Sequence, residues 1–97
     1  MKVITKEEAV TSLQEIAGWN VKDEKWIERR FKFQEFPDGI DFVNKVADIA
    51  EAMDHHPFIS IQYKIVTLSL TSWNAGGLTT LDLEAASKCN ALYQDMK

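Results

Sequence analysis

The sequence contains one cysteine, Cys89, so no disulfide can form within the chain. A single thiol is typical of proteins from reducing compartments, and we expect a cytoplasmic protein. No apolar stretch approaches the roughly 20 residues that cross a bilayer. Charged residues appear by position 2 and again at 6–8, before the apolar run of a signal peptide could form. The sequence therefore predicts no association with membranes.

Positive charge is also scarce, because 11 Lys and Arg residues face 15 Asp and Glu residues, for a net charge of -4. Proteins that bind nucleic acids usually carry a basic face. The densest basic group is Arg29, Arg30 and Lys32. It lies in a predicted strand, where alternation keeps these three side chains from all sharing one face. We therefore expect no nucleic-acid partner.

Repeats, low-complexity tracts and linkers are absent from the sequence. Its 97 residues match the length of one domain, and a hydrophobic content of 45% is enough to fill one core. Residues 1–97 are therefore predicted to form a single domain.

Two of the three predicted helices begin with a capping box, in which a hydroxyl residue is followed three positions later by an acidic residue. Thr5 and Glu8 open the first helix, which we expect to end at Gly18 because glycine favours the helix C-terminus. Thr79 and Asp82 open the last helix. Both helices show apolar residues at the spacing of one buried face.

The second helix carries a wide apolar stripe, which indicates packing on two sides. We expect residues 37–39 (Pro-Asp-Gly) to form a turn that leads into it. Pro57 disfavours helical geometry at His56, so the helix should end near Asp54 or His55. The stripe consists of Phe42, Val43, Val46, Ala47, Ile49, Ala50 and Met53.

Four strands are predicted from alternating apolar and polar residues, at 19–21, 26–33, 58–63 and 65–73. The second strand carries Arg29 on its apolar side, which we expect near the rim of the sheet. Two hairpins with intervening helices predict an α+β fold. Its four-stranded antiparallel sheet should carry three helices on one face, in the order α-β-β-α-β-β-α. The open sheet edges and the apolar stripe favour self-association, as a dimer or a dimer of dimers.

The residues with the clearest chemical potential are His55 and His56, which lie side by side at the end of the second helix. Histidine gains and loses protons near neutral pH and is therefore suited to acid–base catalysis. Glu51 precedes His55 by four positions, so the two side chains can touch on one helix face. A carboxylate there would orient the ring. The alternative is a purely structural role for both histidines.

Other kinds of site have weaker support. Both histidines with Glu51 or Asp54 would supply metal ligands, but adjacent residues rarely aim both rings at one ion, and no third histidine or nearby cysteine completes the set. Cys89 lies on a predicted apolar helix face, which favours a buried, unreactive thiol. We therefore predict neither a metal site nor a nucleophilic cysteine.

A longer pattern surrounds the histidine pair. Glu51 is followed by the run His55, His56 and Pro57, then by Tyr63, Trp73 and Asp82. This spacing resembles the signature of the pterin-4a-carbinolamine dehydratases. The run from Val66 to Asp82, the element order and the length are also similar, so the resemblance covers essentially the whole chain.

The resemblance implies dehydration of a 4a-hydroxytetrahydropterin to a quinonoid dihydropterin, in recycling of a tetrahydrobiopterin-type cofactor. It implies no metal and no organic cofactor. His55 would be the general acid, and His56 would hold the pterin and assist the base step. The resemblance also implies a set of residues that bind or orient the substrate, namely Glu51, Asp54, Pro57, Trp73 and Asp82.

One position departs from much of the family, in which a third histidine stands where this chain has Trp73. An indole cannot act as an acid at neutral pH. We therefore hypothesise that the chain uses the two 4a-hydroxy epimers unequally. Two alternatives remain. One is a non-catalytic binding, assembly or regulatory protein of the same fold. The other is a dehydratase whose working context is not phenylalanine hydroxylation.

Overall fold

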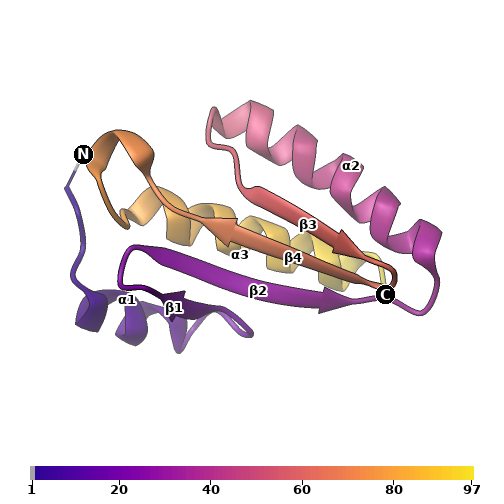
Figure 1. The fold of residues 1–97 in the computed structure, drawn as a ribbon, viewed down its shortest axis with the longest axis horizontal. Helices are drawn as coiled ribbons and strands as arrows, with labels where there is room; N and C mark the ends of the chain where they lie inside the picture. The colour runs from indigo at the N-terminus through magenta and orange to yellow at the C-terminus, as the bar shows by residue number, and fades with distance from the viewer. Residues whose placement is uncertain (1) are drawn as a thin grey trace.

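A computed structural model describes residues 2–97 (Figure 1). Among these residues, the elements follow the predicted order α-β-β-α-β-β-α, with one short 3-10 helix before the last α-helix. Their bounds are α1 Lys6–Leu13, β1 Asn20–Lys22, β2 Trp26–Lys32, α2 Phe36–Met53, β3 Phe58–Gln62, β4 Ile65–Leu70, η1 Trp73–Ala75 and α3 Thr80–Asp95. No helix in this part of the chain combines the length and the apolar character needed to cross a membrane.

The four strands form one antiparallel sheet in the order β1-β2-β4-β3. Each hairpin pairs neighbours in sequence, and β2 joins the hairpins by pairing with β4, where Ile27 lies opposite Leu70. A two-residue turn, Tyr63 and Lys64, connects β3 to β4 because Gln62 pairs with Ile65. The predicted α+β architecture is confirmed.

A single core joins one face of the central strands to the helices. Ile27 and Phe31 of β2 and Leu68 of β4 are fully buried on this face. The helices contribute apolar residues from all three segments, including Ala9, Leu13, Phe42, Val46, Ala86 and Cys89. The opposite face of the sheet is left open to solvent at polar positions of the same strands, as expected for an antiparallel sheet covered on one side.

Cys89 lies in the core with 3% of its surface exposed, as the apolar spacing of the last helix predicts. Burial raises the pKa of its thiol to about 11, because the surrounding apolar atoms disfavour the thiolate.

Arg29 joins β2 to two distant segments. Its guanidinium carbon lies 4.5 Å from the ring centre of Phe31 and 5.1 Å from that of Tyr93. Its Nη1 atom donates to the carbonyl of Ala17 at 3.0 Å and to Oδ1 of Asn90 at 2.7 Å. Desolvation lowers the pKa of this half-buried side chain. The arginine thus ties the loop after α1 to α3 across the rim of the core.

Helix α1 ends at Leu13, so the prediction that it continues to Gly18 is wrong. The following residues form tighter turns, in which the amide of Ile16 donates to the carbonyl of Leu13 at 3.1 Å. Gly18 then adopts a left-handed conformation with φ of 87°. A Cβ atom there would lie 2.5 Å from Nε of Arg29, so both the backbone and the packing require glycine.

Residues 37–39 do not form a separate turn, because α2 already begins at Phe36 and includes them in its first turn. Proline is tolerated there because the first amides of a helix have no partner within it. The buried Gly39 lets the helix approach β4, since a Cβ atom would lie 3.3 Å from the Val66 side chain. The prediction of a turn at these residues is wrong, because proline also suits the first turn of a helix and Gly39 packs against β4.

Candidate active site

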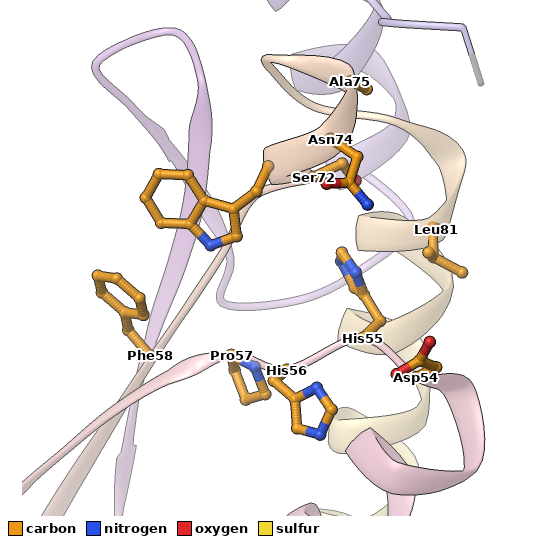
Figure 2. Close-up of a pocket in the computed structure, with 10 residues that line it drawn as sticks. Asp54, His55, His56, Pro57, Phe58, Ser72, Asn74, Ala75 and Leu81 are labelled. Atoms are coloured by element: carbon orange, nitrogen blue, oxygen red, sulfur yellow. The ribbon is translucent and has the colours of Figure 1, made fainter.

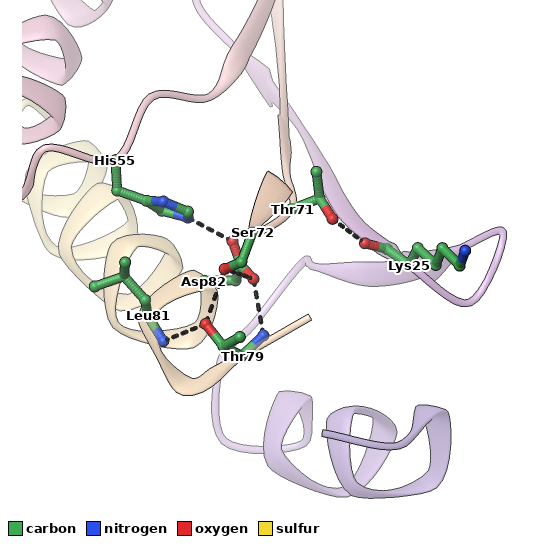
Figure 3. Close-up of polar contacts among 7 residues, drawn as sticks. All are labelled: Lys25, His55, Thr71, Ser72, Thr79, Leu81 and Asp82. Carbon is green, nitrogen blue, oxygen red and sulfur yellow. Dashed lines mark hydrogen bonds and ion pairs between the residues drawn. The ribbon is translucent and has the colours of Figure 1, made fainter. Parts of the chain in front are cut away.

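The end of α2 determines where the first histidine points. The helix stops at Met53, and Asp54 takes a left-handed conformation with φ of 49° and ψ of 44°. The Asp54 amide donates to the carbonyl of Glu51 at 3.3 Å, and the His55 amide donates to that of Ala50 at 3.0 Å. This pair of bonds is a Schellman motif with aspartate at the position usually held by glycine. His55 therefore leaves the helix and turns toward α3 (Figure 3).

His55 is held by a buried carboxylate. Its Nε2 atom lies 2.6 Å from Oδ1 of Asp82, which is fully buried at the start of α3. The other carboxylate oxygen accepts from the hydroxyl of Ser72 at 2.8 Å and from the amide of Thr79 at 3.0 Å. Figure 3 shows these bonds converging on the carboxylate. Asp82 is thus fixed from three directions, which in turn fixes the imidazole.

The predicted capping box of α3 belongs to the same network. Thr79 accepts from the amide of Leu81 at 3.2 Å through its side-chain oxygen, and that oxygen also lies 2.8 Å from the Ser72 hydroxyl. The carboxylate that caps the helix by binding the Thr79 amide is the same one that holds His55. Helix capping and histidine orientation therefore share Asp82.

The second ring nitrogen of His55, Nδ1, is left unpaired in the described part of the chain and is reachable by solvent. Among the described residues, Nδ1 has no hydrogen-bond partner, and no unpartnered side-chain nitrogen is buried. His55 nevertheless has only 10% of its side chain exposed. The ring is therefore nearly enclosed, with Nδ1 as the nitrogen available to a bound molecule.

The predicted contact between Glu51 and His55 is wrong. Glu51 instead pairs with His56, with Oε2 and Nε2 2.5 Å apart. The reason is the left-handed Asp54, which ends the helical spacing that the prediction assumed. The Glu51 and His56 side chains are 76% and 55% exposed, so this pair lies at the surface, where an ion pair contributes about 0–1 kcal/mol.

An aromatic cluster lies next to the histidines. The rings of Trp73 and Phe58 have centres 5.7 Å apart, and both contact Trp26 of β2, at 5.1 and 4.9 Å. Trp73 does not extend β4 as predicted, because the chain turns at Ser72 into η1. Sequence reasoning missed Trp26, although its signal was a single large aromatic among the charged residues on one side of the strand.

A cleft of about 550 Å³ lies between the end of α2 and η1. Figure 2 shows His55, His56 and Pro57 along one part of it and Asn74 along another. The lining also includes Asp54, Phe58, Ser72, Trp73, Ala75 and Leu81. The structure thus brings five predicted site residues to one cleft, with Asp82 behind His55 and Glu51 beside His56.

Tyr63, part of the same sequence pattern, lies elsewhere. It occupies the turn between β3 and β4 with φ of 54°, and 70% of its surface is exposed. It is not part of the cleft lining. Within residues 2–97, no group of three histidine, cysteine or acidic side chains converges as metal ligands would.

Comparison with known proteins identifies the family to which this chain belongs. The family model described as "Pterin 4 alpha carbinolamine dehydratase" matches residues 2–92. A relative from Koribacter versatilis is 45% identical over 92 residues, covering 95% of this chain and 97% of its own. One from Picosynechococcus is 46% identical, covering 92% and 96%. Both relatives carry the name "Putative pterin-4-alpha-carbinolamine dehydratase".

A solved structure from Brucella melitensis is also similar and bears the description "transcriptional coactivator/pterin dehydratase". It is 33% identical with a TM-score of 0.89, over 95% of this chain and 99% of its own. The match in sequence and fold extends across both chains. The chain therefore belongs to the pterin-4-alpha-carbinolamine dehydratase family.

Proposed function

We propose that the chain dehydrates a 4a-hydroxytetrahydropterin to a quinonoid dihydropterin, with His55 as the proton donor. The observation that carries this proposal is the arrangement of His55, which lines the cleft, binds the buried Asp82 through Nε2 and keeps Nδ1 without a partner among the described residues. Membership of the dehydratase family supplies the substrate class. The proposed role is recycling of a tetrahydrobiopterin-type cofactor.

The proposed reaction requires one acid and one base. Protonated His55 donates the Nδ1 proton to the 4a-hydroxyl, the bond between C4a and oxygen breaks, and water leaves. A base removes the proton from N5, and the electron pair of that N–H bond forms the double bond between N5 and C4a. One proton is given and one is taken, so no oxidant or reductant is needed.

The remaining cleft residues have supporting roles in this proposal. His56, paired with Glu51 near the surface, holds the pterin and assists removal of the N5 proton, since its exposure lets it exchange protons with water. Trp73, which is 64% exposed, packs against the flat ring system. Asp54 and Pro57 shape the end of the cleft from which both histidines project.

Stopped-flow measurement of dehydration tests the proposal. The wild-type chain is expected to accelerate the reaction, and His55→Ala should remove roughly a hundredfold or more of that acceleration, as expected for loss of a general acid. Glu84→Gln, an exposed change on α3, is the matched control and should leave the rate unchanged. A wild-type chain without acceleration would favour a non-catalytic binding or assembly role.

We also propose that the chain forms a homodimer or homotetramer. Strand β3 lies at the edge of the sheet, and all five of its residues are exposed. Ile59 and Ile61 pair with buried Leu68 and Val66, so they face the helix side, yet they remain 39% and 41% exposed. An apolar, unpaired edge of this kind favours pairing with a second chain.

A further inference from the structure

Ser72 connects the two sides of the active-site cleft. It is 5% exposed and lies between the end of β4 and the start of η1. Its carbonyl accepts from the amide of Gly76 at 3.0 Å, which closes the turn that carries Trp73. Its hydroxyl donates to Asp82 at 2.8 Å, on the side where His55 lies (Figure 3). No step of the proposed reaction uses this buried hydroxyl directly.

The hydrogen bonds around Ser72 run in one direction only. An ionised carboxylate accepts at both oxygens and donates from neither, so the single Ser72 proton belongs to the bond with Oδ2 of Asp82. The Ser72 oxygen is then left to accept from the Thr79 hydroxyl, 2.8 Å away. The Thr79 oxygen in turn accepts from the Leu81 amide at 3.2 Å. Each hydroxyl therefore has a fixed donor and a fixed acceptor, and neither is free to turn.

The direction of these bonds determines which nitrogen of His55 holds a proton. Oδ2 of Asp82 accepts from the Ser72 hydroxyl and the Thr79 amide, at 2.8 and 3.0 Å. Oδ1 remains as the acceptor for Nε2 of His55 at 2.6 Å, so Nε2 carries a proton. The neutral ring then has its lone pair on Nδ1, and the charged ring has its second proton there. His55 thus exchanges protons with a molecule in the cleft at Nδ1 alone.

We propose that Ser72 is a positioning residue for the dehydration proposed above, on which this inference rests. Its hydroxyl keeps the Asp82 carboxylate turned so that Oδ1 faces His55, which fixes both the tautomer and the orientation of the ring. Without it, only the Thr79 amide would hold Oδ2, and the fully buried Thr79 hydroxyl would lose its acceptor. Because its only proton goes to Asp82, the Ser72 hydroxyl acts through His55 and donates nothing to the substrate.

The first test compares Ser72→Ala with Ser72→Thr, which keeps the hydroxyl and suits the extended backbone at this position. Ser72→Ala is expected to lower kcat for dehydration roughly tenfold and to leave KM within about twofold, because the ring is misplaced only for proton transfer. Ser72→Thr should keep most of the wild-type rate. Ser87→Ala, which changes an exposed serine on α3, is the control. Urea unfolding checks that each variant is folded in the assay.

A double variant separates positioning of His55 from a general effect on the fold. His55→Ala lacks the ring that Ser72 positions, so adding Ser72→Ala should change the remaining rate by less than about twofold. Nitrogen NMR of the wild-type chain with labelled histidine gives a second readout, since it distinguishes a protonated from an unprotonated ring nitrogen. Neutral His55 is expected to show a protonated Nε2 and an unprotonated Nδ1.

Four results would overturn the inference and leave the proposed function intact. Three are kinetic, namely an unchanged kcat in Ser72→Ala, an equal loss in Ser72→Thr, and a full further loss when Ser72→Ala is added to His55→Ala. The fourth is a neutral wild-type His55 that is protonated at Nδ1, which is measurable even if Ser72→Ala does not fold. Failure of the wild-type chain to accelerate dehydration would instead overturn the proposed function, and this inference with it.

Discussion

The Nε2 atom of His55 lies 2.6 Å from Oδ1 of Asp82, although 27 positions separate the two residues in the sequence. Asp82 is completely buried and also binds Ser72 and the Thr79 amide. A buried carboxylate with this many partners holds the imidazole in one orientation.

Replacing this carboxylate should therefore impair both activity and folding. Asp82→Asn is expected to slow dehydration roughly a hundredfold and to lower the free energy of unfolding by about 1–3 kcal/mol, because a buried hydrogen bond loses its charged acceptor. Stopped-flow kinetics and urea unfolding measure the two effects. The double variant with His55→Ala should be little slower than His55→Ala alone. Fully additive losses would mean that Asp82 acts independently of His55.

Asp54 should matter through its backbone conformation more than through its charge. Asn tolerates the left-handed region, so Asp54→Asn should retain the stability and most of the activity. A β-branched residue does not, so Asp54→Val should lose about 1–3 kcal/mol of stability and displace His55. Thermal unfolding and dehydration rates of the two variants check this. Equal loss of rate in both would assign the role to the carboxylate instead.

Trp73 should limit the chain to unequal use of the two 4a-hydroxy epimers, since the aromatic side of the cleft lacks an acid there. The wild-type chain is expected to favour one separated epimer, and Trp73→His should raise the rate with the other roughly tenfold or more. Trp73→Phe keeps an aromatic ring without an acidic proton and serves as control. Equal acceleration of both epimers by the wild-type chain would contradict the hypothesis.

Cys89 should make stability fall at alkaline pH. Its folded-state pKa is raised to about 11, above the ordinary value of 9.0, so between these values the unfolded chain loses a proton that the folded chain keeps. The free energy of unfolding should therefore decrease as pH rises, by at most about 1.4 kcal/mol per unit, and level off near the folded-state pKa. Urea unfolding from pH 8 to 11 measures the slope. Cys89→Ala should lack this component, and identical slopes would refute the assignment.

Self-association should depend on the edge strand β3. Ile61→Lys places a charge at an apolar edge and is expected to shift the chain toward monomer in sedimentation at micromolar concentration. Ser87→Lys, on the exposed side of α3, adds the same charge and should not. A wild-type chain that sediments as a monomer would rule the proposal out.

Local signals in the sequence were enough to predict most of the helices and strands. The capping boxes at Thr5 and Thr79 and the alternation of β2 each depend on neighbours within a few residues, and all appear in the structure. The errors arose where one local signal competed with another. Residues 37–39 have turn chemistry, but the first turn of a helix also accepts proline, and the packing of Gly39 against Val66 favours the helix.

The site was harder to predict because its key contacts are not local. Helical spacing predicted that Glu51 contacts His55. The left-handed Asp54 instead turns His55 away from Glu51, and Asp82 of α3 is its carboxylate partner. The family resemblance predicted that Asp82 orients the site, but it did not predict that Asp82 binds Nε2 of His55. Trp26 does not line the cleft itself, but it contacts Phe58 and Trp73, which do. These contacts depend on the sheet, which brings the two hairpins together.

Asp82 both caps α3 and holds the His55 ring, so the orientation of the catalytic histidine depends on the first turn of α3. Whenever the first turn of α3 frays, the Thr79 amide and the His55 ring lose the same partner together. Hydrogen exchange at the Thr79 amide therefore counts the molecules whose imidazole is unanchored at any moment. The exchange rate of an amide that takes no part in the reaction thus reports the fraction of molecules in which His55 is correctly oriented.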